Sequence, residues 1–196
     1  GGRLDVNGGL EGENAEINIE GAGQLWANGS GDSGSDIDIT ATSGRFANTG
    51  DMTGVDLHIS GSGTDAILAT DNGTYEVGAG HILSIDGAAD VGFDDDDGDL
   101  AILDLDPGAT IALGVEAGEL GSISEFRSGA FGEDEPDVQS GIDLGDAMLE
   151  INLSGLSASA GTTLELMSAD EIVGMFNDAT VEGLGARDAT LVVDYE

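Results

Sequence analysis

The 196-residue sequence predicts an all-β fold, a β-solenoid built from coils of roughly 20 residues. Three apolar–polar–apolar triplets begin at positions 17, 37 and 57: Ile17–Ile19, Ile37–Ile39 and Leu57–Ile59. This alternation is typical of strands, because successive side chains point to opposite faces. Trp26–Asn28 and Phe46–Asn48 repeat with the same spacing. Two short strands per repeat indicate stacked coils in which the first residues of the three triplets are vertical neighbours.

The composition supports a narrow interior. Hydrophobic residues make up 39% of the chain but aromatic residues only 4%, so the core must be built mainly from Ile, Leu, Val and Ala. A thin aliphatic core suits stacked coils better than a globular sandwich. The 34 glycines fit tight corners, where positive φ angles are needed.

The charge balance limits the choice of partners. The chain has 40 acidic residues against four basic ones, all arginine, and a formal net charge of −36. Nucleic acid and anionic membrane surfaces would repel it, so we exclude both, and cations or basic partners are favoured. No apolar run is long enough for membrane insertion. Cysteine is absent, so no disulfide can form.

The regular coils are expected in residues 1–99, and an irregular C-terminal part with a cap in residues 100–196 of the same continuous domain. A first strand carries Leu4 and Val6, and three coils follow over residues 16–80. A fourth coil begins at His81, with an inserted corner near Asn72. In the C-terminal part we expect strands at 101–105 and 110–115, a surface loop at 127–146, strands at 148–153 and 162–167, a helical turn at 168–173 and a strand at 189–195.

The last of these segments carry a family resemblance. Met148–Leu153, Gly161–Met167, Ile172–Phe176 and Ala189–Tyr195 resemble the closing coils of secreted bacterial β-helix proteins of the autotransporter-passenger type. In those coils a strand pair is followed by a Gly-x-Phe turn and a final strand ending in Tyr. The resemblance covers roughly residues 100–196. It implies a right-handed parallel β-helix located outside the cell or at the cell surface, and it implies no single activity.

One candidate cation site is an acidic ladder. Glu16, Asp36 and Asp56 each precede a triplet, and stacked strands would place them about 4.8 Å apart. Like charges at that spacing repel by roughly 1 kcal/mol per pair in water. Ca²⁺ could bridge such carboxylates through their oxygens. The alternative is a solvated acidic face screened by salt.

A second candidate Ca²⁺ site is the densest run of acids. It comprises Asp94, Asp95, Asp96, Asp97 and Asp99, with Asp104 and Asp106 nearby. The run does not fit an EF-hand loop, because with Gly98 as the sixth loop position the first would be Phe93. A solvated acidic turn is the alternative.

Aromatic and histidine residues offer further sites. Trp26 stacked over Phe46 would either fill the interior or form a sugar-binding platform. His58 and His81 occupy strands in successive coils, and His58 should point outward. Two histidines near carboxylates are a weak zinc signal.

Catalytic motifs are weak. The Gly31–Gly34 segment is similar to the nucleophile loop of trypsin-like proteases, but it precedes both histidines and lies in a repeat corner. Polysaccharide lyases typically need Arg or Lys bases, of which this chain has few. We therefore predict no enzyme.

The sequence favours an extracellular structural protein that self-associates head to tail into a filament, surface coat or adhesive matrix, stabilised by cations. Open solenoid ends template other strands, and head-to-tail contacts generate filaments. Leu4 and Val6 at one end, and Val192 and Tyr195 at the other, are the expected assembly residues. The first alternative is an adhesin face that binds glycans or ice. The second is a β-helical polysaccharide-degrading enzyme.

Overall fold

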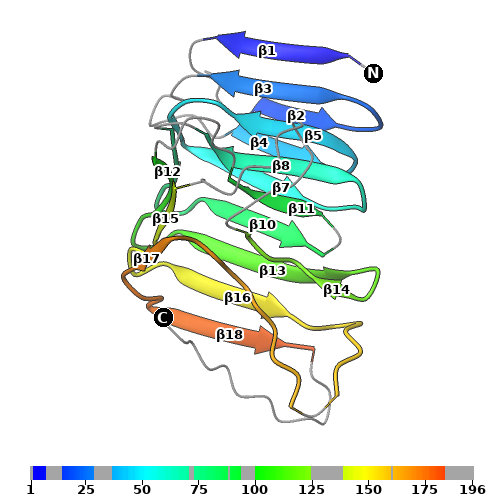
Figure 1. The fold of residues 1–196 in the computed structure, drawn as a ribbon, viewed down its shortest axis with the longest axis vertical. Helices are drawn as coiled ribbons and strands as arrows, with labels where there is room; N and C mark the ends of the chain where they lie inside the picture. The colour runs from blue at the N-terminus through cyan, green and yellow to red at the C-terminus, as the bar shows by residue number, and fades with distance from the viewer. Residues whose placement is uncertain are drawn as a thin grey trace.

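The protein is an all-β structure of parallel sheets (Figure 1). The computed structural model describes residues 2–7, 15–28, 37–70, 73–87, 89–93, 100–124, 139–159 and 161–183. Within these residues the regular structure consists of 18 β-strands, with no helix. The expected all-β class is therefore confirmed.

The strands form three parallel sheets. Sheet A has the order β1 (Arg3–Asn7), β3 (Gln24–Asn28), β5 (Gly44–Asn48), β8 (Thr64–Ala69) and β11 (Asp90–Phe93). Sheet B has the order β2 (Ala15–Ile19), β4 (Ile37–Ala41), β7 (Val55–Ile59), β10 (Ile82–Asp86), β13 (Thr110–Glu116), β16 (Met148–Asn152) and β18 (Asp178–Glu182), and β14 (Glu119–Leu120) folds back antiparallel on β13. Sheet C has the order β6 (Met52–Thr53), β9 (Thr74–Val77), β12 (Leu100–Leu105), β15 (Gln139–Asp143) and β17 (Glu171–Val173).

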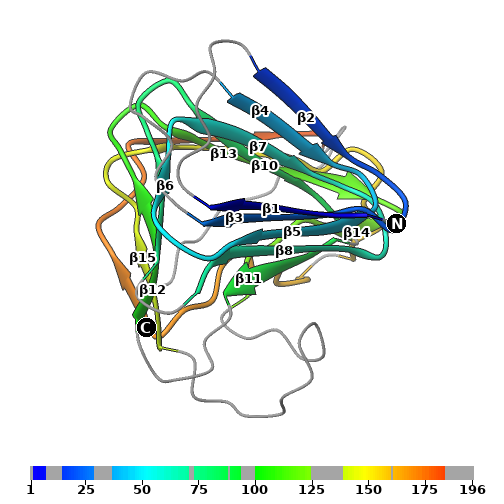
Figure 2. The same cartoon turned by 90° about the horizontal axis from the view of Figure 1, so that it is seen from above.

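The chain visits the three sheets in a fixed order. From β4 onward it passes through sheet B, then A, then C, as in β4–β5–β6 and β7–β8–β9. Two later visits to sheet A are single bridges, Gly92 with Ser124 and Ile123 with Met167. Seen from above, the sheets lie on different sides of a common interior (Figure 2). We call one passage through B, A and C a circuit.

The interior is lined by aliphatic columns. Ile39, Leu57, Leu83, Ile111 and Leu149 are register partners on successive strands of sheet B and are at most 1% exposed. Each such side chain contributes roughly 1.5–3 kcal/mol on burial. A few aromatic side chains, among them Phe46 and Tyr75, complete the core.

The stacking register differs from the expected one. Ile17 pairs with Ile39 rather than Ile37, and Ile39 pairs with Leu57. The two steps are 39 − 17 = 22 and 57 − 39 = 18 residues, so the 20-residue spacing holds only as an average. Both shifts are even, and the apolar residues therefore keep their inward face.

The predicted stack of Trp26 over Phe46 is wrong. Leu25 pairs with Phe46, and Trp26 pairs with Ala47. A shift of one residue exchanges the two faces of a strand, so Leu25 enters the core and Trp26 turns to the outer face. There the guanidinium of Arg3 lies 4.1 Å from the centroid of the Trp26 ring.

The C-terminal part departs from expectation in three places. The predicted loop at 127–146 contains strand β15, and the predicted helical turn at 168–173 contains strand β17 instead. In the predicted strand at 162–167, only a bridge at Met167 forms. The segment 189–195 lies outside the described residues.

Glycine is required where corners of successive circuits touch. Gly61 has a φ of +89°, and a Cβ there would overlap the carbonyl oxygen of Thr42 in the circuit before. Gly145 has a φ of +44°, and a Cβ would overlap the carbonyl of Leu105. These contacts fix how closely the circuits approach each other.

Candidate functional site

The outer face of sheet B carries a column of acids, but its middle member is Asp38 rather than the expected Asp36. Glu16, Asp38 and Asp56 are register partners on β2, β4 and β7. Asp38 takes the place that the sequence suggested for Asp36, because the first circuit is two residues longer than expected. Asp36 itself lies outside the described residues. We call these three residues the first acid column.

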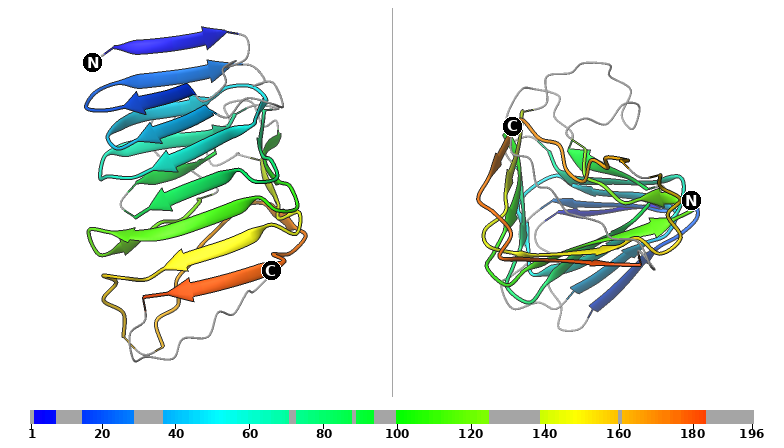
Figure 3. Two further views of the ribbon diagram at one scale, coloured as in Figure 1. Left: turned by 180° about the vertical axis from the view of Figure 1, so that it is seen from behind. Right: turned by 90° about the horizontal axis from the view of Figure 1, so that it is seen from below.

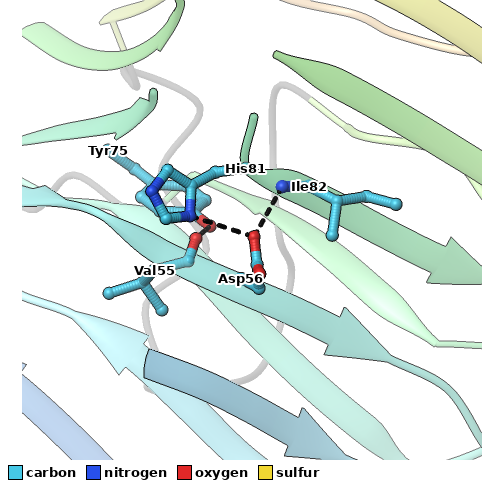
Figure 4. Close-up of polar contacts among 5 residues, drawn as sticks. All are labelled: Val55, Asp56, Tyr75, His81 and Ile82. Carbon is cyan, nitrogen blue, oxygen red and sulfur yellow. Dashed lines mark hydrogen bonds and ion pairs between the residues drawn. The ribbon is translucent and has the colours of Figure 1, made fainter. Parts of the chain in front are cut away.

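Asp56 differs from the other members because its hydrogen bonds reach another strand, whereas Glu16 accepts a hydrogen bond from Asn18 of its own strand. Its Oδ1 accepts the backbone N–H of Ile82 at 2.8 Å and lies 3.1 Å from Nδ1 of His81 (Figure 4). Through these contacts, the Asp56 carboxylate joins β7 to the start of β10. His58 instead stands on the outer face of sheet B, partly buried, between the buried Leu57 and Ile59. The two histidines therefore do not share a site.

Tyr75 makes a further contact with β7 from the interior, next to Asp56. Its side chain is 0% exposed, and its hydroxyl donates to the carbonyl oxygen of Val55 at 3.1 Å (Figure 4). Burial raises the pKa of Tyr75 above its usual range, and the charge of Asp56 raises it further. Tyr75 thus remains a neutral donor that joins sheets B and C. A group so enclosed is structural.

A second acid column, which the sequence analysis missed, lies on sheet C. Glu76, Asp104 and Asp143 are register partners on β9, β12 and β15. Burial raises the pKa of Asp104 above its usual range, and the charges of Asp143, Glu76 and Asp106 raise it further. The available signal was an acid between two apolar residues in three successive circuits. Spacings of 28 and 39 residues (104 − 76 and 143 − 104) hid it.

Neither column forms a compact metal site. Within the described ranges, no three Asp, Glu, His or Cys side chains are grouped so that they could hold a metal ion. The run of Asp94, Asp95, Asp96, Asp97 and Asp99 lies outside those ranges. Binding of Ca²⁺ therefore stays a prediction.

A groove of about 540 Å³ crosses the outer face of sheet B near its C-terminal end. Its floor contains two small residues of β13, Ala112 and Gly114, and three carboxylates lie around it, from Asp86, Glu150 and Glu182. Asp86 leans over the floor, since a Cβ on Gly114 would overlap its Oδ1. The groove exists because β13 presents small side chains between two strands with longer ones. Four strands contribute to it, so no local sequence motif marks it.

The two ends of the molecule, which lie at the top and bottom of the left view in Figure 3, carry exposed apolar side chains. At the N-terminal end a hollow of about 520 Å³ is lined by Leu4, Ile17, Ile19 and Leu25, together with polar neighbours. Leu4 is 54% exposed, whereas Val6 is partly buried against the core. Near the other end, Met175 is 60% exposed and Val173 is 41% exposed. The predicted assembly residues Val192 and Tyr195 lie outside the described residues.

The first acid column yields a matched pair of substitutions. Asp56→Ala should lower the free energy of unfolding by about 1–3 kcal/mol, because it leaves the Ile82 N–H without its acceptor. Asp38→Ala, one strand away in the same column, should be neutral or slightly stabilising, because it removes only like-charge repulsion. Urea denaturation of both variants measures the difference. Equal destabilisation of the two variants would contradict the role of Asp56 in joining β7 to β10.

The second acid column predicts a pH dependence. Because the folded-state pKa of Asp104 is raised, its ionised form destabilises the fold, and this cost is lost as the pH falls through that pKa. Asp104→Asn should therefore raise the thermal midpoint at neutral pH and have little effect below the unfolded-state pKa of about 3.9. Thermal melts from pH 7 to pH 3 test this, with the exposed Glu119→Gln as control. A pH-independent gain would exclude the electrostatic cause.

None of the described segments is a helix long and apolar enough to cross a membrane. Comparison of the chain with protein-family models, with curated proteins and with solved structures found no match in any of the three. The family resemblance noted above therefore remains a prediction.

Proposed function

We propose that the protein is a non-enzymatic structural protein, a single-domain right-handed parallel β-helix whose copies join end to end. The repeated passage through sheets B, A and C supports the helical path. In the view from above, the chain runs clockwise while it moves away from the viewer, which supports a right-handed turn (Figure 2). Right-handed crossovers are also the strongly preferred connection between parallel strands.

The observation that carries this proposal is that the terminal strands at both ends lie beside exposed apolar side chains. Among the described strands, β1 and β2 lead their sheets at one end, and β17 and β18 close theirs at the other. Terminal strands present unpaired backbone groups that accept a further strand. Here those edges lie beside exposed apolar side chains, Leu4 at one end and Val173 and Met175 at the other. Joining different ends repeats without closure and produces filaments.

The charge of −36 sets the conditions for assembly. Copies repel one another over roughly a Debye length, about 8 Å at physiological ionic strength. Cations, Ca²⁺ among them, would lower that repulsion along the two acid columns. An extracellular or cell-surface filament, coat or adhesive matrix fits both this requirement and the family resemblance. Nucleic acid and anionic membranes remain unsuitable partners.

Association of the purified chain tests the proposed function. We expect the mass measured by light scattering to rise with protein concentration and with added NaCl or CaCl₂, and filaments to be visible by negative-stain microscopy. Leu4→Glu should weaken association at least tenfold, because it places a charge in the apolar hollow at the N-terminal end. Leu100→Glu, at a 40% exposed site on sheet C, is the control and should not weaken it. A monodisperse monomer under all conditions would refute the proposal.

The groove on sheet B favours a second candidate function, the binding of a glycan. The groove supplies the hydrogen-bonding groups that sugar hydroxyls require. These are the carboxylates of Glu150 and Glu182, the Asn152 amide and the hydroxyls of Ser154 and Thr180. A shallow groove beside polar side chains also suits a chain-like ligand.

Ala112→Leu should abolish glycan binding, because the larger side chain fills the floor of the groove. Thr40→Leu, at a partly buried outer position on β4 of the same sheet, should leave it unchanged. Glycan-array binding of the wild type and both variants provides the measurement. Binding that survives Ala112→Leu would place the glycan elsewhere.

A further inference from the structure

We infer that the junction between two copies continues sheet B, with β18 of one copy pairing in parallel with β2 of the next. This inference rests on the proposed end-to-end association and names the contact that makes it. Among the described strands, β18 pairs only with β16 and β2 only with β4. Both strands have five residues and run in the same direction within one parallel sheet.

The two ends have complementary shapes. At the N-terminal end, β1 extends sheet A one circuit beyond β2, the first strand of sheet B. At the other end, β18 extends sheet B one circuit beyond Met167, the last described bridge of sheet A. Figure 1 shows β1 and β18 as the outermost strands at opposite ends. A head-to-tail contact therefore places β1 of one copy beside β18 of its neighbour, so that the two copies supply the sheet A and sheet B strands of one circuit.

A head-to-head contact has no such fit. Two copies meeting at their N-terminal ends would bring two protruding β1 strands together. A two-fold axis would also make the terminal strands of sheet B antiparallel. Only the head-to-tail arrangement preserves parallel pairing and continues sheets A and B.

The register of the junction follows from the columns. The inward column that begins at Ile17 ends at Ala179, and the column that begins at Ile19 ends at Val181. An unbroken register therefore places Ile17 of the next copy on Ala179. Ala179 is exposed, and Ile17 lines the hollow at the N-terminal end. A large side chain thus meets a small one, which suits close packing.

The same register brings like charges together on the outer face. Asp178 falls opposite Glu16, Glu182 falls opposite Glu20, and Thr180 falls opposite Asn18 between them. Facing carboxylates disfavour pairing, and salt screens them. The junction therefore needs ionic strength, and Asp178→Asn combined with Glu182→Gln should let it form in less salt.

Cysteine cross-linking tests this register, because the natural chain contains no cysteine. An Asn18→Cys chain is mixed with a Thr180→Cys chain in salt, with oxidised and reduced glutathione as redox buffer. The two positions should lie about 5 Å apart across the junction, within disulfide range, so a covalent heterodimer should form. A chain carrying both substitutions should give a ladder of longer products on a non-reducing gel.

The matched control pairs Asn18→Cys with Glu150→Cys, which lies in the same outward column one strand further in. That separation is about 10 Å, beyond disulfide reach, so its heterodimer yield should be about tenfold lower. Cross-linking of Asn18→Cys to itself, or equal yields from both pairs, would overturn the junction. Association of the unmodified chain without the predicted cross-link would overturn it too, while leaving the proposed function intact. Failure of the unmodified chain to associate would refute the proposed function itself.

Discussion

The structure depends on one constraint: each inward aliphatic side chain of sheet B must rest on its counterpart in the next circuit. The column from Ile17 to Ala179 meets this requirement although the steps between its members are 22, 18, 26, 28, 38 and 30 residues (17, 39, 57, 83, 111, 149, 179). The corners absorb the differences in length, because a loop can grow at little cost while the strands keep their pairing. Glycines such as Gly145 allow the corner backbones to touch where they must.

The interior register also decides which surface charges meet. Side chains on one strand alternate between the core and solvent, so aligning the aliphatic residues aligns the acids between them. The repulsion between stacked carboxylates is reduced in two ways. Asp56 gains a backbone N–H and an imidazole as partners. Asp104 gains no such partner among the contacts that the structure describes, and its pKa rises instead.

Sequence patterns predicted the all-β class and most strands before residue 93, since alternation of apolar and polar residues is a local property. They failed where the answer depends on distant segments. The spacing of 20 misplaced Ile37 by two residues and Trp26 by one, because triplets of similar composition recur without being stacked. The groove on sheet B could not be predicted, since it exists only after β10, β13, β16 and β18 lie side by side. The strand at Glu171–Val173 was mistaken for a helical turn because its pairing with β15 is a tertiary contact.

The outward turn of Trp26 has an optical consequence. It is the only tryptophan of the chain, and it sits at the N-terminal end beneath Arg3 of the outermost strand. Indole emission therefore reports on the attachment of β1, whereas the enclosed phenol of Tyr75 senses the middle of the molecule. The chain has a second tyrosine, Tyr195, and once that residue is replaced by Phe, the two remaining fluorophores distinguish detachment of β1 from loss of the interior packing.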